Sequence, residues 1–386
     1  MKESIRLRSG RIIGRHQPCF IVAEVGNNHQ GRLDMALEMI RQAARCGVDG
    51  VKFQKRDSEA LLTTEGRNAP YNGKNSFGRT YGEHRDALEL DIEEMAQCKR
   101  LAEDLGLVFF ASTWDEVSLS QMEALDVELL KISSADLVDL PMLRQAGETG
   151  LPVIISTGMS GYPEIDMAVS LLRRYHDDLA ILHCNSSYPC PEEQIGLPVI
   201  RQLWERYGQP VGYSGHEQGL GPSVAAAAMG ACVIERHFTL DRTLPGTDHR
   251  VSLDPHGLGQ LVTMVREVEK ALCVREKRVF PSEVCSAKKL RKSIVFARDL
   301  PAGHVLTTAD ITVKCPGTGL SPIHWDGVIG STLLAKARFE EQLSWDMIVP
   351  AGGPLFGLDG AAGNEEQHPR RRAARRPETA AGDSLK

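Results

Sequence analysis

Two histidines in the second half of the chain follow short apolar runs that are typical of buried parallel strands. Two residues separate VGY from His216, and two residues separate ACVI from His237. If these runs are the last two strands of a barrel, both imidazoles emerge side by side at its carboxyl-end mouth. Paired imidazoles are suited to a divalent metal ion, and Asp248 and His249 follow on the next loop. The spacing alone also fits two unrelated loop histidines.

Lysine and hydroxyl side chains stand at the ends of other apolar runs. Lys52 and Gln54 in VKFQ alternate around Phe53, so they point to the same side. Lys131 in LKISS has the same setting, and a buried lysine without an anionic partner is costly. Hydroxyl groups follow four of the runs, at Ser133, Ser134, Ser156, Thr157, Ser186 and Ser214. Each serine alone fits a helix N-cap, but the set predicts a cradle for a phosphate and a carboxylate.

Glu24 ends the first strand candidate, in AEVGNNHQG. A carboxylate in a partly desolvated mouth near a metal fits a general base or an electrostatic anchor for a cationic centre. His29, on the loop that follows, fits a structural hydrogen-bonding role better than a catalytic one.

The elements that must position these residues alternate from Pro18 to about Leu272. Apolar, β-branched runs are separated by amphipathic helical stretches, which indicates βα units and a parallel sheet. The eight strand candidates are CFIVAEV, GVKFQ, LVFFAS, LLKIS, PVIIST, AILHC, PVGY and ACVIER. Polar residues follow nearly every strand, which favours an α/β fold of the (β/α)8 TIM-barrel type over a doubly wound sheet with its site at one switch point.

The pattern divides the chain into five parts. Residues 1–17 are an N-terminal extension, 18–275 the barrel, and 276–290 a lysine-rich linker. Short strands broken by Pro-Ala-Gly and Pro-Gly-Thr-Gly turns predict a small β-rich domain over 291–350. Residues 351–386 lack apolar periodicity and are expected to be disordered.

Composition excludes several classes of protein. With 386 residues, 42% hydrophobic and 25% charged, the chain can bury a large core. The net charge of −6 without a basic stripe gives no reason to expect nucleic-acid binding, and the basic cluster from Arg370 to Arg376 lies in the tail. Nine scattered cysteines fit a reducing compartment. The stretch MKESIRLRSGRIIGRHQP lacks the apolar core expected of a signal peptide, and no run approaches the roughly 20 apolar residues needed to span a bilayer. We expect a cytoplasmic protein that binds no membrane.

Eight ordered motifs resemble the sialic acid synthases, which condense phosphoenolpyruvate with an N-acylated mannosamine. They are AEVGNNHQG, VKFQ, LKISSAD, ISTGM, HCNSSYP, GYSGHEQG, ERHFTLD and PGTDH. The stretch DLPAGHVLTTADITVK resembles the antifreeze-like (SAF) domain of the same enzymes. The resemblance covers about residues 15–350. It implies a (β/α)8 barrel, a C-terminal SAF domain, and a domain-swapped homodimer in which each small domain caps the partner's active site.

The resemblance also implies residue roles. His216 and His237 would bind Mn²⁺ or Mg²⁺, and the catalytic residues would be Glu24, Lys52 and Asp248. The substrate-binding residues would be Lys52, Gln54, Thr113, Lys131, Ser134, Ser156, Ser186, Tyr188, Ser214 and Asp248. In the implied reaction the metal polarises the sugar aldehyde, C3 of phosphoenolpyruvate attacks it, and water adds at C2. Phosphate then leaves by C–O cleavage.

Several positions depart from the family pattern. Cys315 stands where many bacterial members have an arginine before Pro-Gly, Asp115 and Lys289 stand where aromatic residues are common, and Ser186 replaces an asparagine. The stretches NSFGRTYGEHRDALEL and GYSGHEQGLGPSVAAAAMGACVIERHFTLDRT are closer to the animal-type enzyme, which uses N-acetylmannosamine 6-phosphate. We expect N-acetylmannosamine as the acceptor. Its 6-phosphate and the precursors of legionaminic or pseudaminic acid stay open, and the candidate phosphate contacts are Lys74, Arg79, Arg85 and Lys289.

Two other classes are alternatives. A Schiff-base aldolase would use Lys131 as its nucleophile, although the paired histidines argue against it. A non-catalytic, ice-interacting protein built around the terminal domain would leave the whole barrel mouth unexplained.

Overall fold

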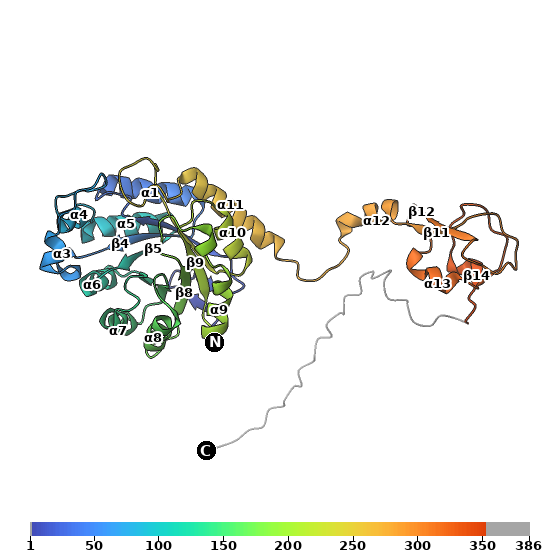
Figure 1. Cartoon of the computed structure of the whole chain (residues 1–386), viewed down its shortest axis with the longest axis horizontal. Coiled ribbons are helices and arrows are strands. Elements are labelled where there is room, and N and C mark those ends of the chain that lie inside the picture. Colours follow the sequence, from blue (N-terminus) through green and yellow to red (C-terminus); the bar gives the residue numbers. More distant parts are fainter. Residues whose placement is uncertain (1, 353–386) are drawn as a thin grey trace, which may run out of the picture. The chain divides into compact units, whose positions relative to one another are not determined.

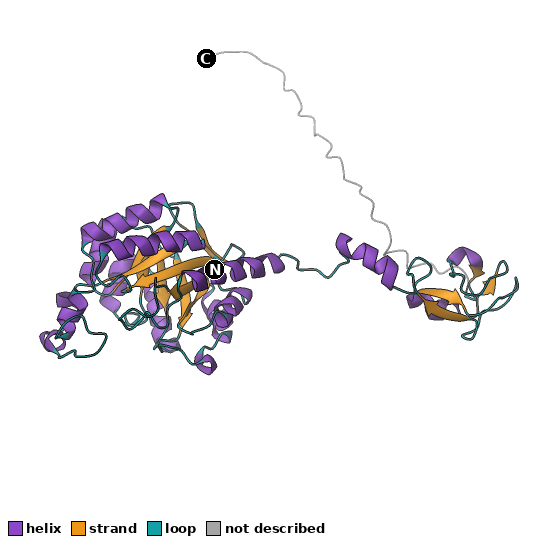
Figure 2. Ribbon diagram, turned by 90° about the horizontal axis from the view of Figure 1, so that it is seen from above, coloured by secondary structure: helices purple, strands orange, loops and turns teal. Residues whose placement is uncertain are grey.

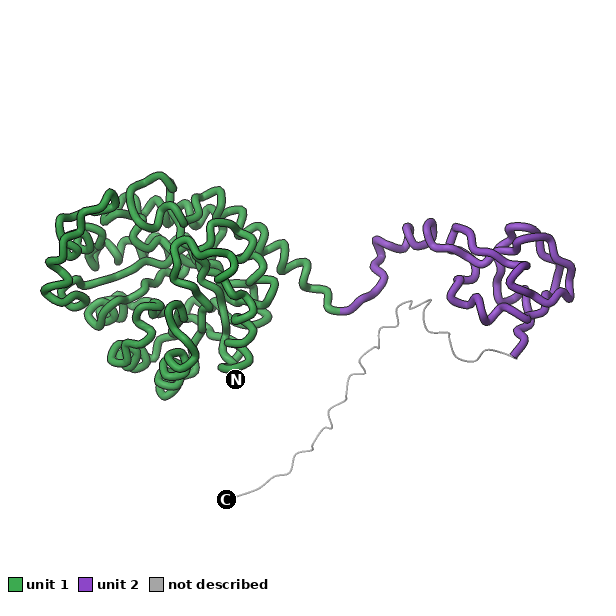
Figure 3. Tube along the Cα trace, in the orientation of Figure 1, with its two compact units in different colours: residues 1–275 green, residues 276–386 purple. Residues whose placement is uncertain are grey.

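The computed structural model describes residues 2–352 (Figure 1). The chain divides into two compact units, residues 1–275 and 276–386 (Figure 3). Most of the segment expected to be disordered, from residue 353 onward, lies outside the described residues. Within the described range, none of the helices combines the length and apolar character needed to cross a bilayer.

The first unit is a closed barrel of eight parallel strands. In barrel order the strands are β10 (Val233–His237), β3 (Phe20–Gly26), β4 (Gly50–Lys55), β5 (Val108–Thr113), β6 (Leu130–Ile132), β7 (Val153–Ser156), β8 (Leu179–Cys184) and β9 (Val211–Gly215). The last strand closes the barrel against the first, with His237 opposite Glu24. The expected (β/α)8 barrel is confirmed, and each strand candidate corresponds to one strand of the barrel.

Helices surround the barrel (Figure 2). They are α1 (Leu33–Cys46), α5 (Ile92–Asp104), α6 (Glu116–Ala124), α7 (Leu140–Glu148), α8 (Tyr162–Leu172), α9 (Pro198–Tyr207), α10 (Gly221–Ala228) and α11 (Pro255–Ala271). Their apolar faces pack on the outward side chains of the strands in one large core. Asp91, Asp139 and Asp254 accept backbone N–H bonds at helix starts. Gly47 ends α1 in the left-handed conformation that glycine adopts readily.

A long excursion separates β4 from α5. It contains three short helices, α2 (Ser58–Leu61), α3 (Thr64–Asn68) and α4 (Tyr81–Asp86). Asn75, between α3 and α4, accepts a hydrogen bond from the N–H of Gly246 at 3.3 Å. This contact joins the excursion to the loop that follows β10, so two distant segments meet beside the barrel mouth.

Residues 1–17 form more than an extension. The strands β1 (Ser4–Arg6) and β2 (Ile12–Gly14) make an antiparallel hairpin. Its side chains Ile5, Leu7 and Ile13 are buried in one cluster with residues at the amino ends of the barrel strands, such as Phe20 and Val108. The hairpin therefore closes the amino end of the barrel with apolar contacts.

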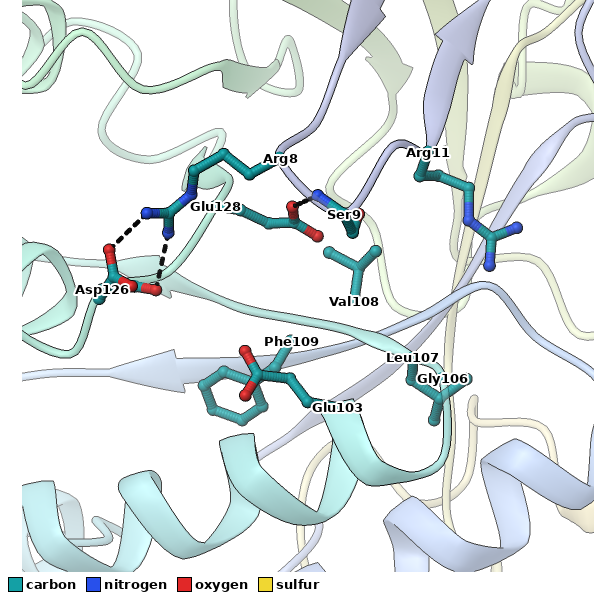
Figure 4. Close-up of a pocket in the computed structure, with 10 residues that line it drawn as sticks. All are labelled: Arg8, Ser9, Arg11, Glu103, Gly106, Leu107, Val108, Phe109, Asp126 and Glu128. Atoms are coloured by element: carbon teal, nitrogen blue, oxygen red, sulfur yellow. Dashed lines mark hydrogen bonds and ion pairs between the residues drawn. The ribbon is translucent and has the colours of Figure 1, made fainter.

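A pocket of about 630 Å³ lies beside this hairpin, where Val108 begins β5 (Figure 4). Its polar groups already have partners within the protein. Arg8 pairs with Asp126 at 2.6 Å, and Glu128 accepts the N–H of Ser9 at 2.7 Å. Arg11 pairs with Asp49 at 2.7 Å. Because both of its arginines already hold carboxylates, this pocket offers no free cation to an anionic ligand.

The second unit is small and contains antiparallel strand pairs. Its elements are α12 (Val284–Leu290), β11 (Ser293–Phe296), β12 (Ile311–Lys314), α13 (Trp325–Val328), β13 (Thr332–Leu333) and β14 (Ile348–Val349), with short 3₁₀ turns between them. It has its own core, which includes Ile294, Phe296 and Leu343. The segment expected to be a linker contains the helix α12 and belongs to this unit.

Candidate active site

A hollow of about 240 Å³ lies at the carboxyl ends of the strands, and all eight strands or the loops after them contribute to its wall. The predicted site residues that line it are Glu24, Lys52, Gln54, Lys131, Ser134, Ser156, Ser186, Tyr188, Ser214, His216 and His237. Of the predicted set, Thr113 and Asp248 do not line it. We term this hollow the barrel mouth.

Strand alternation explains the position of Thr113. Ser112 points inward and accepts a hydrogen bond from Lys52 Nζ at 2.7 Å, so the next residue, Thr113, faces away from the mouth. Trp114, one residue further, lines the mouth again. The guanidinium of Arg56 lies 4.4 Å from the Trp114 ring centroid. The side chains after β5 that face the mouth are therefore Ser112 and Trp114, and Thr113 differs from its expected place.

The two histidine rings lie together, with centroids 5.4 Å apart. His216 Nδ1 lies 2.7 Å from the carbonyl oxygen of Asn185, and since a carbonyl only accepts, Nδ1 carries a proton and Nε2 is left for a ligand. Burial acts to lower the pKa of His216, but Cys184 and Asn185 outweigh it and raise the pKa above its ordinary value. The ring of Tyr188 covers His216 at 4.0 Å.

His237 is buried and lacks a hydrogen bond at Nδ1 within the described part of the chain. Asp248 Oδ2 lies 3.9 Å from this nitrogen. Burial lowers the pKa of His237 to about 4, so its ring is neutral at pH 7 and has a lone pair to donate. A buried, unpaired nitrogen is costly unless a ligand satisfies it, so the ring fits a metal ion.

The protein offers few other metal ligands at this point. Among residues 2–352, no three His, Cys, Asp or Glu side chains gather as a metal-binding group. An ion held here by two imidazoles would keep several coordination positions for substrate oxygens or water, which is the pattern of a catalytic rather than a structural metal site.

Lys52 lies between two buried carboxylates. Its Nζ is 2.9 Å from Glu24 Oε2 and 3.6 Å from Glu235 Oε1. Burial raises the pKa of Glu24 in spite of the lysine. Burial also acts to raise the pKa of Glu235, but Lys52 and Lys131 together hold it below its ordinary value. The cluster therefore contains one carboxylate poised to take a proton and one that stays ionised.

Lys131 has no such partner. It is buried, and its Nζ donates to the backbone oxygen of Ile132 at 2.8 Å. Within the structure described, it makes no ion pair with a carboxylate. Burial lowers the pKa of Lys131 to about 8. Ser134 and Ser156 also line the mouth, so this wall offers an unpaired cation and hydroxyl groups to an anionic ligand.

A buried ion pair sits directly beside the histidines. Arg236 Nη1 donates to Glu217 Oε1 at 2.8 Å, and both side chains are almost completely buried. Tyr213 donates to the second oxygen of Glu217 at 2.8 Å. Glu217 follows His216 and Arg236 precedes His237, so the pair ties the ends of β9 and β10 together and sets the separation of the two rings.

Sequence reasoning missed three of these residues. Glu235 was detectable, because it lies two residues before His237 on one strand and must point to the same side. The partnership of Glu217 with Arg236 had no signal in spacing, because it crosses between two strands. His29, in contrast, has the structural contact expected of it, since its Nδ1 accepts the N–H of Gly31 at 3.1 Å.

The departures from the family pattern have local explanations. Asp115 caps α6, where its carboxylate accepts the N–H of Ser118 at 2.6 Å. In the second unit, Lys314 is paired with Glu340, and the exposed thiol of Cys315 donates to the backbone oxygen of Leu290 at 3.4 Å. These residues therefore have structural contacts of their own.

The fold and the barrel mouth define a class of protein: a (β/α)8-barrel enzyme whose site is suited to small anionic substrates. The family model of the NeuB family matches residues 39–277, and the SAF domain model matches residues 291–349. The chain belongs to the NeuB family. The resemblance to sialic acid synthases and the expected barrel with a C-terminal SAF domain are thus confirmed.

Relatives cover nearly the whole chain. It is 37% identical over 350 residues to human N-acetylneuraminate-9-phosphate synthase, with 90% of this chain and 98% of that protein covered. It is 36% identical to N,N'-diacetyllegionaminic acid synthase of Legionella pneumophila, with 87% and 96% covered. The solved structure of N-acetylneuraminic acid (sialic acid) synthetase from Leptospira borgpetersenii serovar Hardjo-bovis matches with a TM-score of 0.65 and 34% identity, covering 74% of this chain and 95% of that one. These relatives are named for different products, so they leave the acceptor open.

Proposed function

We propose that the protein condenses phosphoenolpyruvate with N-acetylmannosamine, or a related N-acyl hexosamine, to give a nonulosonic acid such as N-acetylneuraminate and inorganic phosphate. The observation that carries the proposal is the barrel mouth, where an unpaired lysine and hydroxyl groups face a pair of histidines. An anionic enol ester and a sugar aldehyde are the two substrates that such a mouth can bring together.

Phosphoenolpyruvate binds, in this proposal, against Lys52, Lys131 and the hydroxyls of Ser134, Ser156 and Ser214. Ser186 completes the set. The support is chemical: Lys131 is buried without a carboxylate partner, and each charge-assisted hydrogen bond to an anion stabilises the complex by about 1.5 to 3 kcal/mol.

The acceptor sugar lies on the side of the histidines. Bound by His216 and His237, a Mn²⁺ or Mg²⁺ ion would polarise the sugar aldehyde as a Lewis acid. Tyr188, Gln54 and Asp248 orient the sugar, and Glu24 moves the proton needed at the reacting carbons, for which its raised pKa is suited. C3 of phosphoenolpyruvate bonds to the aldehyde carbon, water adds at C2, and the C2–O bond breaks to release phosphate.

The test is an assay of phosphate release that requires both substrates. Phosphoenolpyruvate is offered with N-acetylmannosamine, its 6-phosphate, or the diacetamido-trideoxyhexose acceptors. Phosphoenolpyruvate labelled with oxygen-18 in the bridging position should give labelled phosphate. Label that stays in the sugar acid, or phosphate release that no acceptor stimulates, would overturn the proposal.

We also propose that the protein acts in the cytoplasm as a domain-swapped homodimer in which each SAF domain caps the partner's barrel. The nine cysteines, all unpaired in the structure, support a reducing compartment. The dimer follows from the family resemblance and is addressed by the truncation described in the Discussion.

A Schiff-base aldolase is the second candidate. The buried position of Lys131 and its pKa of about 8 favour a nucleophilic amine. Trapping with borohydride in the presence of pyruvate, with turnover that is insensitive to chelators, would support this candidate and exclude the first.

A further inference from the structure

Lys52, Gln54 and Arg56 form a row of polar side chains at the end of β4. Side chains alternate between the two sides of a strand, so Lys52 and Gln54 point the same way, and Arg56 continues the row directly after β4. Lys52 and Gln54 line the barrel mouth, whereas Arg56 lies behind its wall with only 1% of its side chain exposed. A charged guanidinium is costly to bury unless it is paired, and the proposed function leaves this cation without a role.

The guanidinium of Arg56 contacts four segments of the chain. Its Nη2 donates to Gln54 Oε1. Its Nη1 donates to Asn27 Oδ1 at 2.8 Å and to Glu89 Oε1 at 3.1 Å. The same group lies 4.4 Å from the ring centroid of Trp114. These partners belong to the ends of β3, β4 and β5 and to the segment before α5, so Arg56 joins the wall of the mouth to the excursion after β4.

The contact with Arg56 determines which way the Gln54 amide faces. Arginine only donates hydrogen bonds, so the amide atom that meets it must be the oxygen, and the amide nitrogen is turned to the other side. That nitrogen, Nε2, donates to Glu24 Oε1 at 2.9 Å. An amide turned the other way would present its N–H groups to the guanidinium and its oxygen to the carboxylate, so both contacts would be repulsive. Arg56 and Glu24 therefore fix opposite ends of one amide.

Both oxygens of Glu24 are held as a result. Oε1 accepts the hydrogen bond from Gln54, and Oε2 lies 2.9 Å from Lys52 Nζ. Glu24 is the residue proposed to move the proton at the reacting carbons. A proton-transfer group acts only within hydrogen-bond reach of its target, and a misplacement of about 1 Å can cost about 100-fold in rate. The orientation of this carboxylate is therefore worth fixing from behind.

We propose that Arg56 is a positioning residue for the condensation: acting through Gln54, it holds Glu24 in the orientation that the proton step needs. The reaction step rests on the proposed function, whereas the chain of contacts from Arg56 to Glu24 does not. Loss of Arg56 frees the Gln54 amide to rotate and leaves Lys131 and the hydroxyl groups of the mouth in place. The loss should therefore fall on kcat and not on KM for phosphoenolpyruvate.

The experiment measures kcat and KM for Arg56→Met, for Gln54→Met and for the double variant, with the acceptor that gives the fastest turnover. Arg56→Met should lower kcat about tenfold or more and change KM for phosphoenolpyruvate by less than about twofold. Because Arg56 acts through Gln54, the double variant should have the kcat of Gln54→Met to within about twofold. Arg56→Lys keeps a positive charge beside Glu89 and should lose only about threefold.

A matched control separates positioning from general loss of stability. Arg266 pairs with Asp49 at 2.7 Å, next to the first residue of β4. Arg266→Met should lower the midpoint of thermal unfolding and leave kcat unchanged. If Arg56→Met does not fold, Arg56→Lys still decides the proposal, because its smaller loss of kcat must also vanish in a chain that carries Gln54→Met.

The outcomes separate the two proposals. An unchanged kcat in the Arg56 variants, or losses that multiply in the double variant, overturns the positioning role and leaves the proposed function standing. Absence of phosphate release with every acceptor overturns the proposed function.

Nuclear magnetic resonance decides the positioning role even without turnover. The side-chain amide protons of Gln54, assigned by their loss in Gln54→Met, should exchange with solvent about tenfold or more faster in Arg56→Met. The amide of Gln42, which donates to Glu38 Oε1 at 2.7 Å on α1, is the control and should not change. Equal exchange at Gln54 in the wild type and the variant contradicts the proposal.

Discussion

At the barrel mouth, the two buried lysines have opposite surroundings. Lys52 is held between Glu24 and Glu235, so its charge is matched before any substrate binds. Lys131 is buried without a carboxylate contact, and its ammonium form is costly in the ligand-free protein. An anionic substrate removes that cost. Lys131 is therefore the residue whose protonation should respond most strongly to phosphoenolpyruvate.

This difference gives a pH prediction. The pKa of Lys131 is lowered by burial to about 8, below the ordinary value of 10.5. Below about pH 8 the folded protein bears a buried charge, and as pH rises from about 8 toward 10.5 this penalty is lost and the ligand-free protein gains stability. Phosphoenolpyruvate needs the charged form, so its affinity should fall over the same range. Calorimetric titration from pH 7 to 10 measures this, and a slope that persists unchanged in Lys131→Met would contradict it.

The histidine pair gives a second prediction at this scale. His216→Ala and His237→Ala should each abolish turnover and weaken Mn²⁺ binding by tenfold or more, because each removes one of the two imidazoles proposed to hold the ion. Binding of Mn²⁺ is followed by electron paramagnetic resonance in the absence of substrate, and thermal unfolding checks that the barrel remains folded. His256→Ala, an exposed histidine at the start of α11, is the control. Wild-type Mn²⁺ affinity in either variant would remove the metal assignment.

Among the elements, the ends of β9 and β10 are joined by a charge pair instead of by apolar packing alone. Removing one partner of a buried pair leaves the other charge unmatched, which costs about 3 to 5 kcal/mol. Glu217→Ala should therefore lower the free energy of unfolding by that amount and also weaken Mn²⁺ binding, because the histidine rings lose their fixed separation. Denaturant unfolding and Mn²⁺ titration are the measurements.

The double variant Glu217→Leu with Arg236→Met provides the check on this argument. It removes both charges, so it should be more stable than either single variant. If the two single losses simply add, the residues do not act as a pair.

The βα rhythm could be predicted because it depends on local apolar periodicity, and so could most of the barrel mouth, because strand ends converge in any parallel barrel. The sequence could not predict that Ser112, and not Thr113, faces the barrel mouth, because a shift of one residue along a strand decides which side chain points inward. The N-terminal hairpin could not be predicted, because its strands are three residues long and carry too few apolar side chains to form a recognisable pattern. The meeting of the segment around Asn75 with the loop after β10 could not be predicted either, because it depends on a tertiary hydrogen bond from the N–H of Gly246 to Asn75.

For the whole molecule, the two compact units raise the question of what the small one contributes. The barrel unit has its own extensive core, so a chain that ends at Arg275 should fold. If the SAF domain caps the partner's site, this truncated chain should bind phosphoenolpyruvate normally but show a KM for the acceptor raised tenfold or more, because the mouth stays open to water. Light scattering gives the oligomeric state alongside. An active monomer, or a truncated barrel as efficient as the full chain, would contradict capping by the partner.

The hairpin of residues 4–14 closes the amino end of the barrel, so the barrel is open only at its carboxyl end, or rim. Substrates and products must therefore all pass through the carboxyl end of the barrel. Lys131 and Ser156 lie at the bottom, nearly inaccessible, whereas Tyr188 at the rim is 49% exposed. A sugar seated at the rim blocks the way to the bottom, so phosphoenolpyruvate should enter first, and kinetics should be ordered. Product inhibition patterns measure the order in which the two substrates bind, and random binding would contradict this prediction.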